Sequence, residues 1–120
     1  MIFTMHNFRK LHVWNDAMEL AGELYELLEK FPNEEKYGLV SQMKRCAVSI
    51  PSNIAEGAGR NTKGEFRQFL GIATASSYEL ETQLLLSRRM KFIGETDIDH
   101  VLPKLHALQK RIYKFKNTLN

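Results

Sequence analysis

The side chains of this chain that could carry chemistry are its histidines, two serines beside a proline, and one cysteine. A metal site in a helical protein needs histidines and carboxylates that recur three or four residues apart on one face. The histidines are scattered and show no such pairing; they are His6, His12, His100 and His106. This spacing favours surface histidines and predicts no metal site.

Nucleophilic catalysis and cofactor binding find no better support. Ser49 and Ser52 flank Pro51, but no histidine or lysine is placed on the same segment to activate a hydroxyl. The stretch from Glu56 to Gly59 follows a helical pattern, whereas a phosphate-binding loop lies between a strand and a helix. We interpret its two glycines, Gly57 and Gly59, as a helix stop. The sequence therefore predicts a protein that is not an enzyme and needs no cofactor.

A stripe of polar side chains runs at three- and four-residue steps through Gln42, Arg45, Ser49, Asn53, Glu56 and Arg60. A later segment offers a partial match in Ser76, Glu79 and Gln83. Such a stripe is either a solvated helix face or a hydrogen-bond network between helices or subunits. Short serine and asparagine side chains suit close packing, and both interpretations stay open at this point.

Basic side chains form a second constellation. Flexible cations on one surface are sufficient for sequence-independent contacts to phosphates. Helical proteins commonly carry such residues, so charge alone does not establish the function. The candidate nucleic-acid-binding residues are Lys44, Arg45, Arg60, Lys63, Arg67, Arg88, Arg89, Lys110, Arg111 and Lys114.

Apolar residues at helical spacing predict four helices that must position these side chains. We expect them at residues 13–30, 35–58, 62–92 and 96–118, and no strand pattern competes. The apolar stripe predicted to face the core from the first helix includes Met18 and Tyr25. A chain of 120 residues fits one domain, here residues 1–120. Short links between long amphipathic helices predict an all-α, antiparallel, up-down-up-down four-helix bundle.

Local signals refine the helix ends. Pro51 predicts a kink or short break in the second helix, and Pro103 predicts a bend or late start in the fourth. The residues from Thr62 to Glu65 read as a capping box that begins the third helix. Gly94 is expected to close the third helix, and the residues from Thr96 to Asp99 to open the fourth.

Composition places the protein in the cytoplasm. The lone Cys46 cannot form an internal disulfide, which fits a reducing compartment and a core or interface thiol. No segment is long and apolar enough to cross a membrane. The N-terminal residues 1–10 carry their charges after a short apolar stretch, which is the wrong order for a secretory signal.

Charge is unevenly distributed along the chain. Residues 1–38 hold four basic and seven acidic side chains, whereas residues 39–95 hold eight and five and residues 96–120 hold five and two. This asymmetry fits either an anionic partner or charge-complementary packing between copies. In the second case, Glu19, Glu23 and Glu26 of an acidic first helix would meet a basic surface of a neighbouring subunit.

Several motifs resemble a known family. They are Phe-Arg-Lys-Leu-His-Val-Trp at residues 8–14, Gln-Met-Lys-Arg at 42–45, Ala-Val-Ser-Ile-Pro-Ser-Asn-Ile-Ala-Glu-Gly at 47–57, and Ser-Tyr-Glu-Leu-Glu-Thr-Gln-Leu at 77–84. Together they are similar to the four-helix bundle proteins encoded in intervening sequences of bacterial 23S rRNA genes. The accessory proteins of diversity-generating retroelements look like relatives of the same group.

The resemblance implies an antiparallel four-helix bundle that assembles into a homopentameric ring. Among the retroelement relatives it implies binding of structured RNA or DNA, and of a reverse transcriptase, through a basic surface. The motif residues Ser49, Asn53 and Glu56, together with Pro51, Gly57 and Gly59, are expected to be structural rather than ligand-binding.

Two functional classes follow from these observations. In the first, the protein is an oligomeric accessory module that binds structured RNA or other nucleic acid, and a ring gathers several weak basic patches into one surface. In the second, it is a protein–protein interaction scaffold whose positive charge serves solubility and subunit packing. The two differ in salt response, because counterion release makes nucleic-acid binding strongly dependent on salt.

Overall fold

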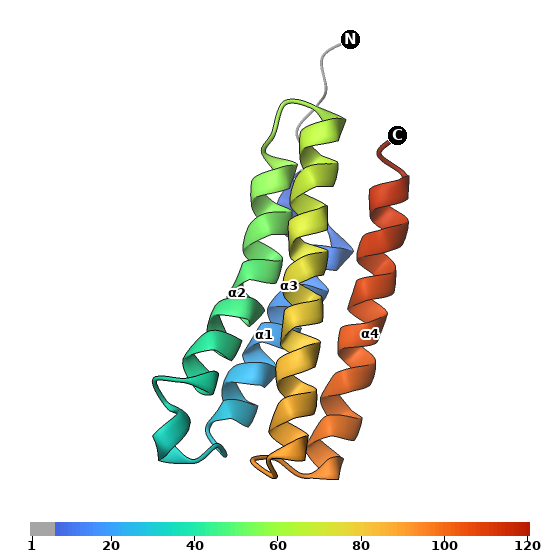
Figure 1. Cartoon of the computed structure of the whole chain (residues 1–120). Coiled ribbons are helices and arrows are strands. Elements are labelled where there is room, and N and C mark those ends of the chain that lie inside the picture. Colours follow the sequence, from blue (N-terminus) through green and yellow to red (C-terminus); the bar gives the residue numbers. More distant parts are fainter. Residues whose placement is uncertain (1–6) are drawn as a thin grey trace.

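The computed structural model describes residues 7–120, and four α-helices make up most of this part. The helices are α1 (His12–Leu28), α2 (Leu39–Ala58), α3 (Lys63–Arg89) and α4 (Glu95–Asn117). Short 3-10 helices, η1 (Phe8–Lys10) and η2 (Asn33–Glu35), precede α1 and α2. The four helices lie side by side in an elongated bundle of 53 × 25 × 20 Å (Figure 1). Residues 7–120 contain no strand, which confirms the predicted all-α class there.

Contacts between helix ends fix which ends are neighbours. Lys30, just past α1, forms a 2.8 Å ion pair with Asp97 in the first turn of α4. Arg67, near the start of α3, donates to the backbone carbonyl of Leu119 (2.9 Å), just past α4. The end of α1 therefore lies beside the start of α4, and the start of α3 lies beside the end of α4.

One apolar core runs through the bundle. Each helix contributes residues at three- and four-residue spacing, as a helix with one buried face must. Leu24 of α1, Ile54 of α2, Phe66 of α3 and Leu105 of α4 are 0% exposed. Two residues of the predicted first stripe, Met18 and Tyr25, are instead exposed, because the apolar arc of α1 is wider than the face that its neighbours cover.

The helix α2 differs from the prediction in two respects, its first residue and its continuity at Pro51. It begins at Leu39, later than the predicted residue 35, after η2 and a turn. It continues through Pro51 without the predicted break. A proline removes one backbone hydrogen bond, and the fully buried neighbours Ile50 and Ile54 hold the helix against the core on both sides. The helix α4 likewise runs through Pro103 from Glu95, so it has no late start.

Gly57 does not stop α2 as predicted. It lies inside the helix, which ends at Ala58 with Gly59 as its C-cap residue. A Cβ at Gly57 would lie 2.8 Å from Phe66 Cδ1 and 2.8 Å from the Cβ of Phe69. Glycine is therefore needed at this position because α2 and α3 approach too closely for any side chain.

The ends of α3 show one confirmed cap and one that the sequence misplaced. Thr62 Oγ1 accepts from the Glu65 backbone N–H (3.1 Å) and donates to the Glu65 carboxylate (3.0 Å), so the predicted start is confirmed. The helix ends at Arg89 rather than near residue 92. Lys91 takes the left-handed conformation (φ 62°), and Phe92 N–H donates to the Ser87 carbonyl (2.9 Å). This is the Schellman arrangement, with lysine at the position where glycine is usual.

Polar pairs attach α4 to its two neighbours. On the α1 side, Glu23 accepts from Lys104 (2.5 Å) and lies 3.1 Å from the His100 imidazole. On the α3 side, Glu81 accepts from Gln109 (2.9 Å) and lies 3.0 Å from His106. Two of the predicted surface histidines thus bridge helices.

These contacts lower carboxylate pKa values. Lys104 first, and His100 to a lesser degree, hold the pKa of Glu23 below its ordinary value, although burial acts to raise it. Gln109 and then His106 lower the pKa of Glu81, and Lys30 lowers that of Asp97. Each of these carboxylates therefore stabilises the folded state when it is ionised.

Replacing Gly57 by alanine should destabilise the fold by about 1–3 kcal/mol, because the added methyl group overlaps Phe66 and Phe69. Gly22→Ala is the matched control, since a Cβ at Gly22 meets nothing within 4 Å and the residue lies mid-helix in α1. That control should gain about 0.5–1 kcal/mol. Urea unfolding at one protein concentration measures both, and equal effects of the two substitutions would contradict the close-approach argument.

Stability should fall as the medium is acidified. A carboxylate whose folded pKa is depressed contributes stability that is fully present above its unfolded pKa and is lost as pH falls through the folded pKa. The free energy of unfolding should therefore decrease as pH falls below about 5. Glu23→Gln and Glu81→Gln should each flatten this decrease, as measured by urea unfolding across pH.

Glu19→Gln provides the control for acidification, because Glu19 is exposed and makes no ion pair within residues 7–120. It should leave the pH profile close to that of the parent protein. If the Glu23 and Glu81 variants also follow the parent profile, the helix-bridging pairs contribute nothing to acid sensitivity.

Candidate nucleic-acid interface

The centre of the polar stripe joins α2 to α3. The hydroxyls of Ser49 and Ser76 lie 2.9 Å apart. The Asn53 amide donates both to the Ser49 carbonyl (2.8 Å) and to the Ser49 hydroxyl (2.9 Å). All three side chains are half-buried. Of the two interpretations left open by the sequence, the inter-helix network holds here, and these polar groups are engaged within the chain.

The ends of the stripe are solvated. Gln42, Arg45, Glu56 and Arg60 are exposed. The Arg60 guanidinium lies 4.6 Å from the centroid of the Phe69 ring, a cation–π contact across the connection between α2 and α3. The solvated-face interpretation therefore applies at both ends of the stripe.

Cys46 lies beside this network and is not a candidate nucleophile. Burial, followed by the neighbouring Glu79 carboxylate, raises the pKa of the Cys46 thiol to about 11. The side chain of Gln83 is 7% exposed and donates to Glu79 (3.4 Å). A thiol with so high a pKa stays protonated at neutral pH, and only the thiolate is strongly nucleophilic. Cys46 acts as a small buried packing residue between α2 and α3.

The predicted nucleic-acid-binding residues fall into three groups. The α2–α3 connection and the C-terminus lie at the same end of the bundle (Figure 1). The first group is at this end, on the α2–α3 connection, the start of α3 and the later turns of α4. The second group lies in the second turn of α2 and the third at the end of α3, both away from this end. The groups are Arg60, Lys63, Arg67, Lys110, Arg111 and Lys114; Lys44 and Arg45; and Arg88 and Arg89.

Intramolecular contacts engage about half of these cations. Arg111 pairs with Asp16 of α1, and Arg88 lies 3.8 Å from Glu95. Arg67 donates to the backbone carbonyl of Leu119, as described above. The Lys44 ammonium lies 5.0 Å from the centroid of the Tyr25 ring. Such residues position helices as well as contributing positive charge.

The remaining cations have no acidic partner in the part of the chain that the structure describes. They are Arg45, Lys63, Arg89, Lys110 and Lys114. Three of the five, Lys63, Lys110 and Lys114, belong to the group at the α3-start and α4-end of the bundle. Unpaired ammonium groups on flexible stems are suited to phosphate contacts, and this end is therefore the candidate interface with nucleic acid.

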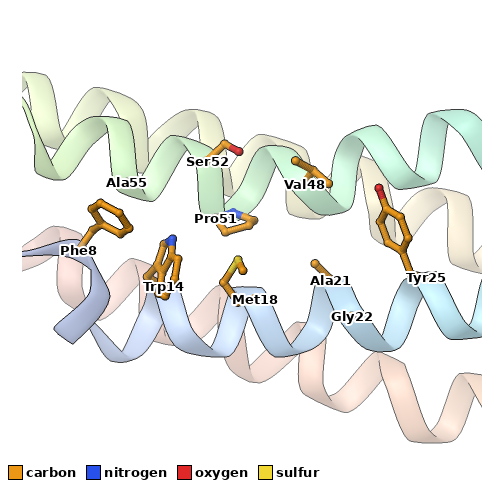
Figure 2. Close-up of a pocket in the computed structure, with 10 residues that line it drawn as sticks. All are labelled: Phe8, Trp14, Met18, Ala21, Gly22, Tyr25, Val48, Pro51, Ser52 and Ala55. Atoms are coloured by element: carbon orange, nitrogen blue, oxygen red, sulfur yellow. The ribbon is translucent and has the colours of Figure 1, made fainter.

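An apolar groove of about 510 Å³ lies between α1 and α2. Figure 2 shows the side chains that line it: Phe8, Trp14, Met18, Ala21, Gly22, Tyr25, Val48, Pro51, Ser52 and Ala55. Met18, Val48 and Tyr25 are 47%, 44% and 42% exposed. The lining contains no carboxylate, histidine or lysine, so the groove offers mainly apolar contact. The sequence pattern did not reveal this groove, because it placed Met18 and Tyr25 on the stripe predicted to face the core.

The structure offers no metal-binding cluster within residues 7–120, where no three histidine, cysteine or carboxylate side chains gather to hold an ion. His6 and residues 1–6 of the N-terminal stretch lie outside the described residues. In the same described range, no helix has the length and apolar character to cross a bilayer.

Comparison with known structures supports the fold. The chain is similar to a protein of unknown function from the S23 ribosomal protein family of Bacteroides thetaiotaomicron VPI-5482, solved by crystallography at 1.70 Å resolution. The two share 24% sequence identity with a TM-score of 0.81, over 87% of this chain and 97% of the other. At this identity the likeness establishes the fold alone.

The sequence comparison establishes the family. No curated protein matches the chain. The pattern of the family described as 23S rRNA-intervening sequence protein matches residues 9–114, from η1 to the later turns of α4. This match covers most of the chain and extends into α4, beyond the motifs that carried the resemblance. The chain therefore belongs to the family of 23S rRNA-intervening sequence proteins.

Proposed function

We propose that the protein is a non-enzymatic, oligomeric accessory module that binds structured RNA or other nucleic acid. The binding surface is the basic end of the bundle, formed by the start of α3 and the later turns of α4. The observation that carries the proposal is the set of unpaired ammonium groups there, on Lys63, Lys110 and Lys114.

The electrostatics of this end favour phosphate binding. Three carboxylates belong to the elements that meet at this end: Asp16 pairs with Arg111, the Glu65 carboxylate accepts from Thr62, and Glu56 is exposed. Arg111 offsets the charge of Asp16, and the six cations of this group outnumber these three carboxylates. Phosphates approaching this surface therefore meet positive potential.

Assembly is the second part of the proposal. By family resemblance, the protein forms a homopentameric ring of antiparallel, up-down-up-down bundles in the cytoplasm. The contacts between opposite helix ends described above support the antiparallel order. The apolar groove between α1 and α2, together with exposed Ile72, Leu86 and Met90 on α3, supplies surface that subunits can bury. A ring would repeat each basic end and raise avidity for one RNA.

One of the three acidic residues predicted to contact a neighbouring subunit is engaged within its own chain. This residue, Glu23, is bound by Lys104 and His100 of the same chain. The proposed acidic contribution to an interface therefore rests on Glu19 and Glu26, which are exposed on α1. A reverse transcriptase remains a proposed protein partner by resemblance to the retroelement proteins.

The solution mass tests the assembly. Light scattering should give a mass of about five subunits for the parent protein. Val48→Asp should lower that mass, because it places a charge in the apolar groove. Tyr37→Asp, which charges an 88% exposed side chain that does not line the groove, should leave it unchanged. A monomeric parent protein would contradict both the ring and the charge-pairing idea.

RNA binding across a salt series tests the function. Log affinity for a structured RNA should fall steeply with log salt, and Lys63→Glu with Lys114→Glu should lower the slope by about two, one for each lost phosphate contact. Arg111 is left intact because its substitution would also break the pair with Asp16. The control is Lys36→Glu, which reverses an exposed cation outside this group.

A second function, a protein–protein scaffold without a role in nucleic-acid binding, is favoured by one observation, the apolar groove between α1 and α2. A scaffold would bind its partner with a shallow salt dependence. It would tolerate the charge reversals at Lys63 and Lys114 and lose binding through Val48→Asp. A protein that forms the oligomer but ignores RNA at low salt has the scaffold function instead.

A further inference from the structure

Two exposed tyrosines flank lysines on the surface between α3 and α4. A cleft of about 460 Å³ there is lined by Tyr78 of α3 and by His106, Gln109, Lys110, Tyr113 and Lys114 of α4. Tyr78 is 57% exposed and Tyr113 is 66% exposed. Neither side chain belongs to the core, and neither makes a ring contact or hydrogen bond of its own within residues 7–120. The fold therefore gives no account of why these two rings lie there.

The charges of the cleft have one sign. Glu81 does not line the cleft, and its two carboxylate oxygens contact Gln109 and His106 rather than a lysine. Lys110 and Lys114 have no acidic partner in the described chain. The cleft thus presents two aromatic faces beside two ammonium groups that have no ion-pair partner within residues 7–120, and the residues that line it include no carboxylate.

We propose that unpaired nucleotides of the bound nucleic acid stack on Tyr78 and Tyr113 in this cleft while Lys110 and Lys114 contact their phosphates. Exposed aromatic rings next to flexible cations are the arrangement by which proteins hold single-stranded nucleic acid, because every base has a face that can stack. In a duplex the bases are already stacked on one another, so it can use the lysines but not the rings. The inference rests on the proposed function and narrows its ligand to RNA or DNA with unpaired bases.

The occupant follows from charge and ring chemistry together. An apolar protein helix would bury the tyrosine rings but leave two ammonium groups desolvated and unpaired, at a high free-energy cost. A second copy of this chain would have to bring its exposed Glu19 and Glu26 to these lysines, a case that the solution mass of Tyr113→Ala distinguishes. A strand of nucleic acid supplies both the flat apolar surfaces and the anions, at alternating positions along one backbone.

Two RNAs of equal phosphate number test the inference, a hairpin with an unpaired loop and a fully paired duplex. The parent protein should bind the looped RNA about tenfold more tightly, the effect of about one stacked base. Tyr113→Ala and Tyr78→Ala should each reduce this preference several-fold. Tyr113→Phe should keep it, because the ring face remains. Binding is measured by fluorescence anisotropy of labelled RNA at fixed salt.

Tyr37→Ala is the matched control. Tyr37 is also an exposed tyrosine beside a lysine, with the Lys36 ammonium 5.5 Å from its ring centroid, but it lies before α2 and outside the cleft. Its removal should not change the preference. An equal loss in Tyr37→Ala, or a preference that survives in Tyr113→Ala, would overturn the stacking role. A fall in solution mass of Tyr113→Ala would overturn it too, because the cleft would then be a subunit contact.

A titration with a short unpaired oligonucleotide separates this inference from the proposed function. Ring signals of Tyr78 and Tyr113 in the NMR spectrum should shift on its addition, whereas those of Tyr37 should not. Equal affinity for loop and duplex, without ring shifts, overturns the stacking inference and leaves RNA binding intact. Shifts without measurable affinity for either larger RNA support the cleft and contradict the proposed structured-RNA function. No shift and no affinity overturn both.

Discussion

The close contact between α2 and α3 is the constraint on which the rest of the structure depends. At Gly57 the two helices come so near that a single added carbon would lie 2.8 Å from two phenylalanine side chains. Farther along the same pair, the Ser49 and Ser76 hydroxyls meet at 2.9 Å. Small residues at both places allow the backbones to approach, and the approach buries Ile54 and Phe66 completely. The other helices are positioned against this pair.

The helix α4 is attached differently. Its apolar face completes the core, but its flanks are tied by polar pairs, with Glu23 and Asp97 on the α1 side and Glu81 on the α3 side. These pairs sit partly in solvent, so each contributes modest stability, typically below about 1 kcal/mol. Their larger consequence is for charge. Glu81 contacts Gln109 and His106 rather than a lysine, so Lys110 and Lys114 have no ion-pair partner within residues 7–120.

The packing of α4 against α1 and α3 therefore determines which charged groups and aromatic rings of this surface stay exposed. The family match and the structural likeness establish the fold and the family, and neither names a ligand. The unpaired lysines at one end and the two tyrosines between α3 and α4 belong to the described surface of this chain. They supply a physical argument for the proposed nucleic-acid binding that does not depend on what relatives are called.

The sequence by itself determined the four helices, most of the core and the α3 cap, because periodicity and capping depend on residues close together in the chain. It misjudged Gly57 as a helix stop and Met18 as core, and of the kink or short break predicted at Pro51 the structure excludes the break. Each of these depends on how closely a neighbouring helix packs. The sequence also counted Arg111 as a free cation, yet Asp16, distant in sequence, pairs with it. Which charges remain available, and which rings stay exposed, is decided only when helices far apart in the chain are brought side by side.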